Sequence, residues 1–449
     1  MQGLIMAAQL ITGISLLVIL HELGHFWAAR AFGIKVEKFY LFFDAWGKKL
    51  FSIKIGETEY GIGWLPLGGY VKIAGMIDES MDTEQMAKPA ESWEFRSKPA
   101  WQRLIVMIGG VIMNVIAGII IFAMISYHYG EKYTVNASLK HGVVASDFAK
   151  EMGFKDGDKL KSVNGKEIKY FENALSTDEI LGDVTVYKVE RNGADTEVTL
   201  PHDFAGKYAS ANKLDFLSPR FEFKIAETVP GFPAEKAGIK QGDVLHKVDS
   251  ADVTYFDQLQ AALKHVSGKT AQVTLSRTRD GETGMVTDTM VLPVDVTADG
   301  KIGIGPEPVG IEYDSIKFGF FQSFPMGMNK AYETIAAQVK GWGKIFKGDI
   351  PANKAVQGPI GIAKFYGGEW IWSRFWLFTA LISLGLAFMN ILPIPALDGG
   401  HVVLLIVEMV TGRPISTKAM ERIQTVGMVI LLTLMVLIFG NDIIGLFTK

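Results

Sequence analysis

Long apolar stretches alternate with polar ones along this chain of 449 residues. Four of the apolar stretches hold at least 18 residues without a charged side chain. About 20 such residues in a helix cross the roughly 30 Å hydrocarbon core of a bilayer. The pattern therefore predicts four transmembrane helices, within residues 1–30, 101–128, 373–411 and 423–449. The alternative is that all four are buried helices of a large soluble protein.

The first apolar stretch has the length of a signal peptide. It lacks a basic segment before it and a small-residue cleavage site after it, so we expect a permanent helix. The third stretch is interrupted by Pro393 and Pro395, and Asp398-Gly399-Gly400 follows before apolar residues resume. Because a broken helix in a membrane must line a cavity or contact protein, this break predicts a polar cavity.

Residues 50–75 alternate in the way that is typical of strands. Phe51, Ile53 and Ile55 alternate with polar residues, a turn follows at 56–59, and the apolar return ends in glycines. We expect a membrane-associated β-hairpin. Its free edge, at 60–67, could pair with an extended peptide, and the alternative is an ordinary hairpin packed on the helices.

An internal repeat occupies the region between the second and third apolar stretches. At an offset of 85 residues, nine of the 23 positions from 149 to 171 meet an identical residue, including Gly157-Asp158 against Gly242-Asp243. The pattern of helix, Gly-Asp turn and strand resembles a PDZ domain used twice. PDZ domains bind extended peptides or C-termini, and the alternative is that the pair serves only as a spacer or a steric gate.

Composition narrows the classes of function. Apolar residues reach 49% and charged residues 21%, which fits a mixture of lipid-embedded and soluble parts. A net charge of −3 gives no support for nucleic-acid binding. The chain has no cysteine, so any zinc must be held by histidine and carboxylate.

The candidate chemistry lies at the end of the first apolar stretch, in His21-Glu22-Leu23-Gly24-His25. On a helix the two histidines share one face and can bind one divalent ion, with Glu22 beside them as a general base. Three ionisable groups on a lipid-length helix are costly unless they have a function.

A third ligand should come from the broken helix. Asp398 could complete a His-His-Asp zinc site that leaves one position for water. His401, one turn later, is a rival ligand. A third reading is that Asp398 only caps the helix that restarts there.

Three motifs together resemble the intramembrane site-2 metalloproteases, and the paired PDZ pattern resembles their bacterial RseP branch. They are the histidine motif, Gly68-Gly69-Tyr70, and the segment from Asn390 to Gly399 with Pro393, Pro395 and Asp398. One departure is Gly109-Gly110, where many relatives have Gly-Pro. The resemblance implies a zinc cofactor on His21, His25 and Asp398, Glu22 as the base, and Asn390 as a residue that places substrate. We further expect substrate contacts at Pro393, Pro395, Gly61, Gly63, Trp64, Gly68 and Gly69.

The function implied is hydrolysis of a peptide bond in or near the transmembrane segment of single-pass membrane proteins. Anti-sigma factors trimmed by a first cut and remnant signal peptides are the substrates implied, and the PDZ pair could also take peptide C-termini. Two other classes stay open. A membrane scaffold would use a structural zinc, which usually has four protein ligands, and a transporter would show an inverted repeat, which the spans lack.

The basic residues flank the connections between helices 1 and 2 and between helices 3 and 4. By the positive-inside rule these connections face the cytoplasm, the histidine motif lies toward the cytoplasmic side of a bacterial inner membrane, and the repeat lies on the periplasmic side.

The fold expected is a multi-pass α-helical membrane protein with a membrane-associated β-hairpin or sheet and two extracytoplasmic PDZ-like α+β domains. Its expected parts are transmembrane helix 1 (1–30), a cytoplasmic-side segment with the hairpin (31–100), transmembrane helix 2 (101–128), two PDZ-like domains (129–220 and 221–312), an amphipathic linker region (313–372), the broken transmembrane helix 3 (373–411), a cytoplasmic loop (412–422), and transmembrane helix 4 with the tail (423–449).

Overall fold

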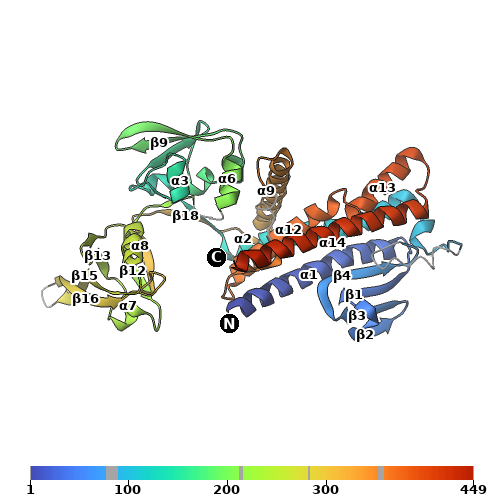
Figure 1. Cartoon of the computed structure of the whole chain (residues 1–449), viewed down its shortest axis with the longest axis horizontal. Helices are drawn as coiled ribbons and strands as arrows, with labels where there is room; N and C mark the ends of the chain where they lie inside the picture. Colours follow the sequence, from blue (N-terminus) through green and yellow to red (C-terminus); the bar gives the residue numbers. More distant parts are fainter. Residues whose placement is uncertain (1, 77–88, 212–215, 282–283, 352–357, 448–449) are drawn as a thin grey trace. The chain divides into compact units, whose positions relative to one another are not determined.

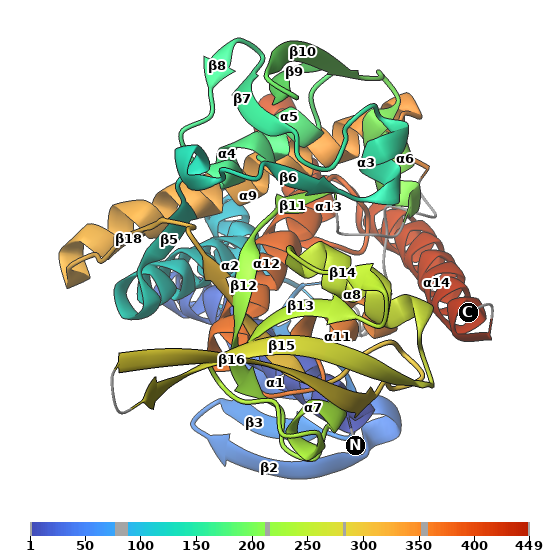
Figure 2. The ribbon, with the colours of Figure 1, turned by 90° about the vertical axis from the view of Figure 1, so that its left-hand side faces the viewer.

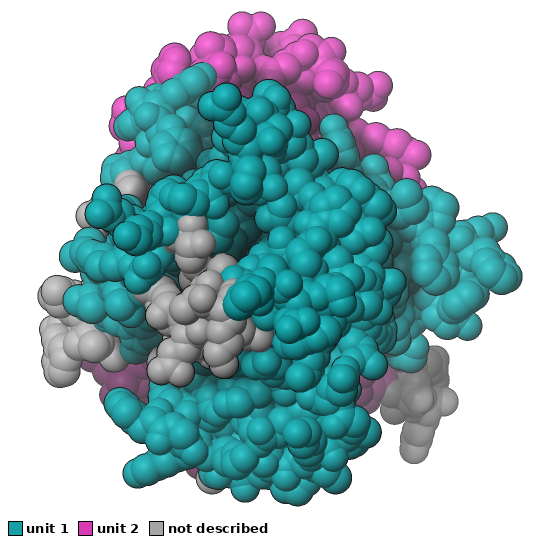
Figure 3. Space-filling model, turned by 90° about the vertical axis from the view of Figure 1, so that its right-hand side faces the viewer, with its two compact units in different colours: residues 1–130, 317–449 teal, residues 131–316 magenta. Residues whose placement is uncertain are grey.

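The chain forms two compact units in its computed structural model. The first unit joins two separate pieces of the chain, 1–130 and 317–449, and the second is the piece between them, 131–316 (Figure 3). The structure describes residues 2–76, 89–211, 216–281, 284–351 and 358–447.

Among its described residues, the first unit contains four helices that are long and apolar enough to span a membrane, as the sequence predicts. They are α1 (Gln2–Ala31), α2 (Ala100–Tyr129), α12 (Trp372–Ile391) and α14 (Thr417–Phe447) (Figure 1). At 1.5 Å per residue, α1 and α2 are each about 45 Å long, so they tilt in a bilayer or extend beyond its core. Both α1 and α12 pack along α2, and α1 and α12 also contact each other.

The third apolar stretch is broken where the prolines predict it. Helix α12 ends at Ile391, and α13 (Asp398–Thr411) begins after six residues of irregular backbone. Within this break Ala396 has a φ of 73°, in the left-handed region that a residue with a Cβ rarely adopts. The backbone is therefore forced into this shape by its surroundings.

Two further helices of the first unit lie in the linker region. They are α9 (Phe320–Lys347) and α11 (Pro359–Tyr366). The small residues Gly327 and Ala331 let α9 approach α2 and α12 closely, since a Cβ at position 327 would lie 2.5 Å from the carbonyl oxygen of Ile119. The opposite face of α9 exposes apolar side chains, as an amphipathic helix at a membrane surface would.

The region after α1 is a four-stranded sheet rather than a lone hairpin. Strands β2 (Lys49–Ile55) and β3 (Thr58–Gly63) form the predicted hairpin, and β4 (Leu65–Ile73) follows. Strand β1 (Val36–Phe43), which the sequence analysis missed, inserts between β3 and β4, so the order is β2-β3-β1-β4. Its sequence, VEKFYLFF, does not alternate cleanly between polar and apolar residues and gives little strand signal.

The strand order corrects the predicted free edge. Strand β3 pairs with β2 on one side and, in parallel, with β1 on the other, so residues 60–63 have no free edge. Among the described strands, β4 is the outer strand beside α1, and it pairs only with β1. The edge that could take up an extended peptide near the histidines therefore belongs to β4.

The second unit contains two halves with the same topology, which agrees with the internal repeat. The first half has the sheet order β10-β9-β7-β8, and the second has β16-β15-β13-β14. In Figure 2 the long strands β15 and β16 lie side by side. Strands β5 (Glu131–Thr134) and β18 (Tyr313–Ile316) pair with each other at the two ends of the unit. The other elements are β6 (Val143–Ala145), α3 (Asp147–Glu151), β7 (Lys159–Val163), β8 (Lys166–Glu167), α4 (Phe171–Ala174), α5 (Thr177–Ile180), β9 (Thr185–Arg191), β10 (Ala194–Leu200), α6 (Phe204–Ala211), β11 (Leu217–Pro219), β12 (Glu222–Thr228), α7 (Pro233–Lys236), β13 (Val244–Val248), β14 (Ala251–Asp252), α8 (Phe256–His265), β15 (Thr270–Gly281), β16 (Gly284–Asp295) and β17 (Ile304–Val309).

A buried ion pair is repeated in the two halves. Asp158 accepts two hydrogen bonds of 2.7 Å from Arg191, and Asp243 accepts two of 2.7 Å from Arg277. Both aspartates are fully buried, and each arginine also donates to the carbonyl oxygen of the glycine that ends the first helix of its half. The halves thus share chemistry as well as topology. Their identity as PDZ domains stays a prediction.

Candidate functional site

The two histidines of the first helix lie on one face of α1. His21 and His25 are one turn apart, and their Nε2 atoms are 3.2 Å from each other. Their rings meet edge to face, with centroids 4.8 Å apart. Two imidazole nitrogens this close to each other are placed to share one cation.

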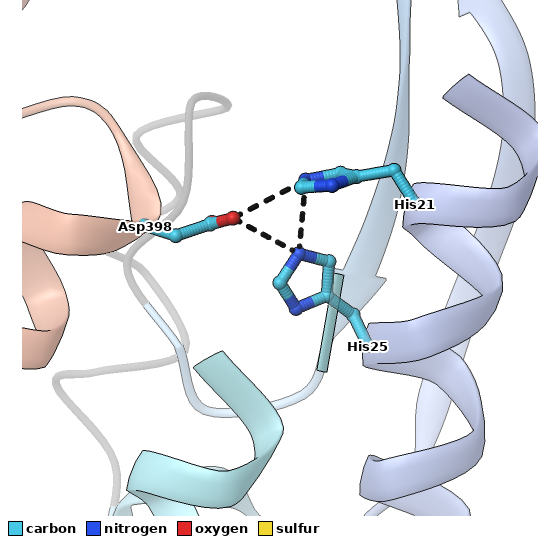
Figure 4. A group of neighbouring side chains, drawn as sticks. All are labelled: His21, His25 and Asp398. Carbon is cyan, nitrogen blue, oxygen red and sulfur yellow. Dashed lines mark hydrogen bonds and ion pairs between the residues drawn. The ribbon is translucent and has the colours of Figure 1, made fainter. Parts of the chain in front are cut away.

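Asp398 reaches the same point from the start of α13. Its Oδ2 atom lies 3.2 Å from Nε2 of His21 and 3.3 Å from Nε2 of His25 (Figure 4). Otherwise this buried oxygen has no hydrogen-bond partner among the described residues. Ligands around a tetrahedral zinc ion are separated by about 3.3 Å when the metal–ligand bonds are about 2.0–2.1 Å. The three atoms therefore fit three corners of a zinc site.

The other ring nitrogen of His25 is held by the backbone of α2. Nδ1 of His25 lies 2.8 Å from the carbonyl oxygen of Val106, an acceptor, so Nδ1 carries the proton. Nε2 is then free to bind a metal. A carbonyl that fixes the tautomer in this way is a common support for a metal-binding histidine.

Asn114 plays the corresponding part for His21. It is fully buried on α2, and its side-chain nitrogen lies 3.3 Å from Nδ1 of His21. Its Oδ1 has no hydrogen-bond partner in the part of the chain that the structure describes. Turning the amide by 180° places Oδ1 on Nδ1 of His21, which then donates and leaves Nε2 for a metal. Asn390 approaches from α12, with Nδ2 3.4 Å from Nε2 of His21.

Glycines bring α1 and α2 together at the histidines. A Cβ on Gly24 would lie 2.2 Å from the carbonyl oxygen of Gly109, and a Cβ on Gly110 would lie 2.4 Å from Nε2 of His25. The sequence analysis noted Gly109-Gly110 only as a departure from the family pattern. The structure gives these glycines a steric role, because they make room for the imidazole rings.

His21, His25 and Asp398 line a cavity of about 690 Å³. Glu22 lines it and interacts electrostatically with His25, His21 and Asp398. Gly69 of β4 lies beside Glu22, because a Cβ at that position would be 3.6 Å from Cγ of Glu22. Gly68 and Asn390 also line the cavity.

A polar cluster forms part of the cavity wall. Asp44 accepts hydrogen bonds from Lys38 at 2.9 Å and from the hydroxyl of Tyr70 at 2.8 Å, and all three residues line the cavity. Burial raises the pKa of Asp44, but the two hydrogen bonds, the positive charge of Lys38 and a backbone hydrogen bond together outweigh it and lower the pKa below its usual value. The cluster therefore keeps a charged, water-attracting surface in the cavity. The sequence analysis missed it because Lys38 lies on β1, Asp44 follows directly after β1, and Tyr70 comes from β4.

Five predicted substrate-contacting residues lie elsewhere in the fold. Gly61, Gly63, Trp64, Pro393 and Pro395 are not among the residues that line the cavity. The two glycines lie on β3 and face neighbouring residues of β1, while the indole of Trp64 donates to the carbonyl oxygen of Ala45. The two glycines are kept from the cavity because β3 is an inner strand of the sheet. Pro395 is kept from it because its segment packs against α14.

His401, the rival ligand, is engaged by another residue. It is buried on α13, and its Nε2 lies 2.6 Å from the side-chain nitrogen of Gln424 on α14. The group of three that can hold a metal, within the described chain, is His21, His25 and Asp398.

The comparisons with known proteins cover almost the whole chain. The profile of peptidase family M50 matches residues 9–434. The regulator of sigma-E protease RseP of Escherichia coli is 29% identical over 463 residues, with 97% of each chain covered. The regulator of sigma E protease of Haemophilus influenzae is 31% identical over 456 residues, with 97% of this chain and 98% of the relative covered. A protein from Neisseria meningitidis that carries a zinc metalloprotease name is 30% identical over 455 residues. The chain therefore belongs to peptidase family M50, a family of zinc metalloproteases.

Proposed function

We propose that this M50 protease cleaves peptide bonds within or next to the transmembrane segments of single-pass membrane proteins. The observation that carries the proposal is the triangle of His21, His25 and Asp398 inside a bundle of membrane-length helices, with Glu22 beside it. We assign the three as zinc ligands and Glu22 as the general base.

The chemistry follows from these assignments. A bound zinc ion supplies Lewis acidity, which lowers the pKa of a coordinated water to about 7 and polarises a peptide carbonyl. Glu22 accepts the proton of the attacking water and returns it to the amine nitrogen of the leaving peptide. Three protein ligands leave a fourth position open, which is typical of catalytic rather than structural zinc.

The substrate must be extended before it is cut, because a helix hides each carbonyl in a hydrogen bond to the residue four positions on. We assign the free edge of β4 as the surface that holds the unwound segment, since Gly68 and Gly69 lie on it and line the cavity. Asn390 supports the same substrate from α12. The cluster around Asp44 attracts water to the cavity.

For the orientation, we propose that the connections rich in lysine and arginine face the cytoplasm and that the second unit lies outside. Two relatives carry the name regulator of sigma-E protease, which links them to a sigma factor, so we propose an anti-sigma factor as one substrate class. Remnant signal peptides are the other class proposed.

The variant Glu22→Gln tests the assignment directly. It should keep bound zinc and lose cleavage of a model transmembrane substrate by about 10²-fold or more, because it removes the base but no ligand. The matched control is His25→Gln, which should lose both. Cleavage at the parental rate by Glu22→Gln would refute the protease mechanism.

We also propose that the second unit acts as a gate for substrates whose outer domain has been trimmed. Strands β5 and β18 pair at the ends of the unit, with Thr134 opposite Tyr313, so a short linker can replace residues 135–310. The shortened protein should cut untrimmed substrates that the full chain leaves intact. No cleavage of untrimmed substrate, with trimmed substrate still cut, would contradict the gate.

A non-catalytic scaffold that recruits partners through its second unit is the second candidate. The repeated, PDZ-like halves of the second unit favour it, since PDZ domains bind peptides. A scaffold predicts normal partner recruitment and no cleavage by the parent protein.

A further inference from the structure

Gln424 is a buried polar residue on α14, close to the start of the long apolar part of that helix. Its side chain is 7% exposed and makes two hydrogen bonds to other parts of the first unit. Oε1 accepts from the backbone N–H of Ala396 at 2.9 Å, and Nε2 lies 2.6 Å from Nε2 of His401. A buried amide in a membrane helix is costly unless its partners matter.

The two partners of Gln424 stand on either side of Asp398. Ala396 lies two residues before Asp398, in the break, and His401 lies three residues after it, on the first turn of α13. One amide therefore holds the segment that carries Asp398 at both ends. Both ends of the amide are used. Its oxygen accepts from the N–H of Ala396, and its nitrogen donates to Nε2 of His401.

The backbone at the first of these contacts is strained. Ala396 has a φ of 73°, and such a conformation persists only where the surroundings impose it. The hydrogen bond from Gln424 is one of these constraints. The other is Gly427, one turn further along α14, where a Cβ would lie 2.3 Å from the carbonyl oxygen of Pro395.

We infer that Gln424 is a positioning residue for the zinc ligand Asp398. It acts through Ala396 and His401 and does not touch the metal. The inference rests on the proposed function, because it assumes that Asp398 binds zinc. It gives α14, the least buried of the four long helices, a part in the active site.

The contact also accounts for His401. Because Nε2 of His401 faces the amide nitrogen of Gln424, it is directed to α14 rather than to the nitrogens of His21 and His25. The residue that competes with Asp398 in the sequence thus supports Asp398 in the structure.

The test measures zinc affinity by competition with a chelator in full-length Glu22→Gln protein, where no cleavage interferes. Gln424→Met keeps the approximate volume and removes both hydrogen bonds, so it should weaken zinc binding by about 10–100-fold, as loss of a residue that orients a ligand does. In the protein with Glu22 intact, the same change should lower kcat and leave KM within about threefold, because the β4 edge is untouched.

Gln9→Met is the matched control. Gln9 is also fully buried in a long helix and donates to the carbonyl oxygen of Gly367 at 3.0 Å, but it does not line the cavity. It should lower thermal stability and leave zinc affinity within about threefold of the parent. If Gln9→Met and Gln424→Met lose the same zinc affinity, general destabilisation explains both losses and the inference is overturned.

His401→Leu keeps the inference testable if Gln424→Met does not fold. It removes one of the two anchors and should weaken zinc binding by at least about threefold. Zinc affinity equal to that of the parent in Gln424→Met overturns the role of Gln424. If Gln424→Met does not fold, the same result in His401→Leu overturns it. Failure of the Glu22→Gln parent to bind zinc would instead contradict the proposed function.

Discussion

The two proposed zinc ligands on α1 are held by different kinds of partner. His25 donates from Nδ1 to the carbonyl oxygen of Val106, which belongs to the helical backbone of α2 and cannot turn away. His21 depends on the side chain of Asn114, whose amide can rotate. A single substitution of Asn114 can therefore change the tautomer of His21, whereas no substitution removes the carbonyl that holds His25.

We expect Asn114→Leu to weaken zinc binding by about 10-fold, since His21 then loses the group that fixes its ring and tautomer. Chelator competition in the Glu22→Gln background measures the affinity. Asn114→Asp is the matched variant, because its carboxylate can still accept from Nδ1 of His21 and should preserve most of the affinity. Equal affinities for the leucine variant and the parent would show that His21 needs no side-chain partner.

The repeated ion pairs of the second unit allow a comparison inside one chain. Asp158→Asn should destabilise the first half by roughly 2–4 kcal/mol, because the guanidinium of Arg191 loses a buried charged partner while part of it stays in contact with water. Asp243→Asn should do the same to the second half through Arg277. Hydrogen exchange in the full-length protein, followed peptide by peptide, measures each effect. Exchange that changes equally in both halves would contradict the assignment of one pair to each half.

Among the elements, α1 and α2 approach each other through backbone rather than through side chains. Gly24, Gly109 and Gly110 leave no room for a Cβ at the level of the histidines. Close approach through small residues is the usual way for membrane helices to pack, since lipid offers no hydrophobic drive between them. Here the approach also determines where the imidazole rings lie.

Gly110→Ala should therefore damage the metal site as well as the packing. Its methyl group would fall 2.4 Å from Nε2 of His25, so the ring must move and zinc affinity should drop by at least about 10-fold, with an overpacking cost of roughly 1–3 kcal/mol. Gly385→Ala, in the apolar helix α12, is the control, because its nearest neighbour would be 3.8 Å away. Zinc binding that survives Gly110→Ala unchanged would mean that the helices can separate without disturbing the ligands.

The sequence predicted those elements whose signal is local. Long uncharged stretches predict the four helices, and Pro393 and Pro395 predict the break before α13, because both depend on residues close together in the chain. Strand β1 escaped prediction because its sequence does not alternate cleanly between polar and apolar residues and gives little strand signal. Once β1 is placed, β3 becomes an inner strand and the free edge moves to β4.

The candidate site divides in the same way. The histidine pair follows from helical periodicity, and Asp398 followed from the family resemblance after spacing alone had left His401 as a rival. Asn114 and Gln424 could have been suspected only as polar residues in apolar helices. What they contact depends on how α2 and α14 pack, and no local pattern carries that information.

At the scale of the whole molecule, the orientation in the membrane decides which compartment supplies water and substrate. The proposed orientation, based on the flanking charges, has the connection between α13 and α14 in the cytoplasm and the second unit outside. The chain contains no cysteine, so single cysteines can be introduced without removing others. Ala194 in the second unit and Ser416 before α14 are both exposed, and each differs from cysteine by little volume.

We expect a membrane-impermeant maleimide, added from the outer side of sealed membranes, to label Ala194→Cys and to leave Ser416→Cys unmodified. After the membranes are disrupted, both should react, which shows that each thiol is accessible in the folded protein. Ala117→Cys, buried in α2, should stay unlabelled in both conditions and controls for unfolding. Labelling of Ser416→Cys but not of Ala194→Cys in sealed membranes would show the opposite orientation in the membrane. The zinc site would then face the opposite compartment, and a gate that inspects outer domains would be excluded.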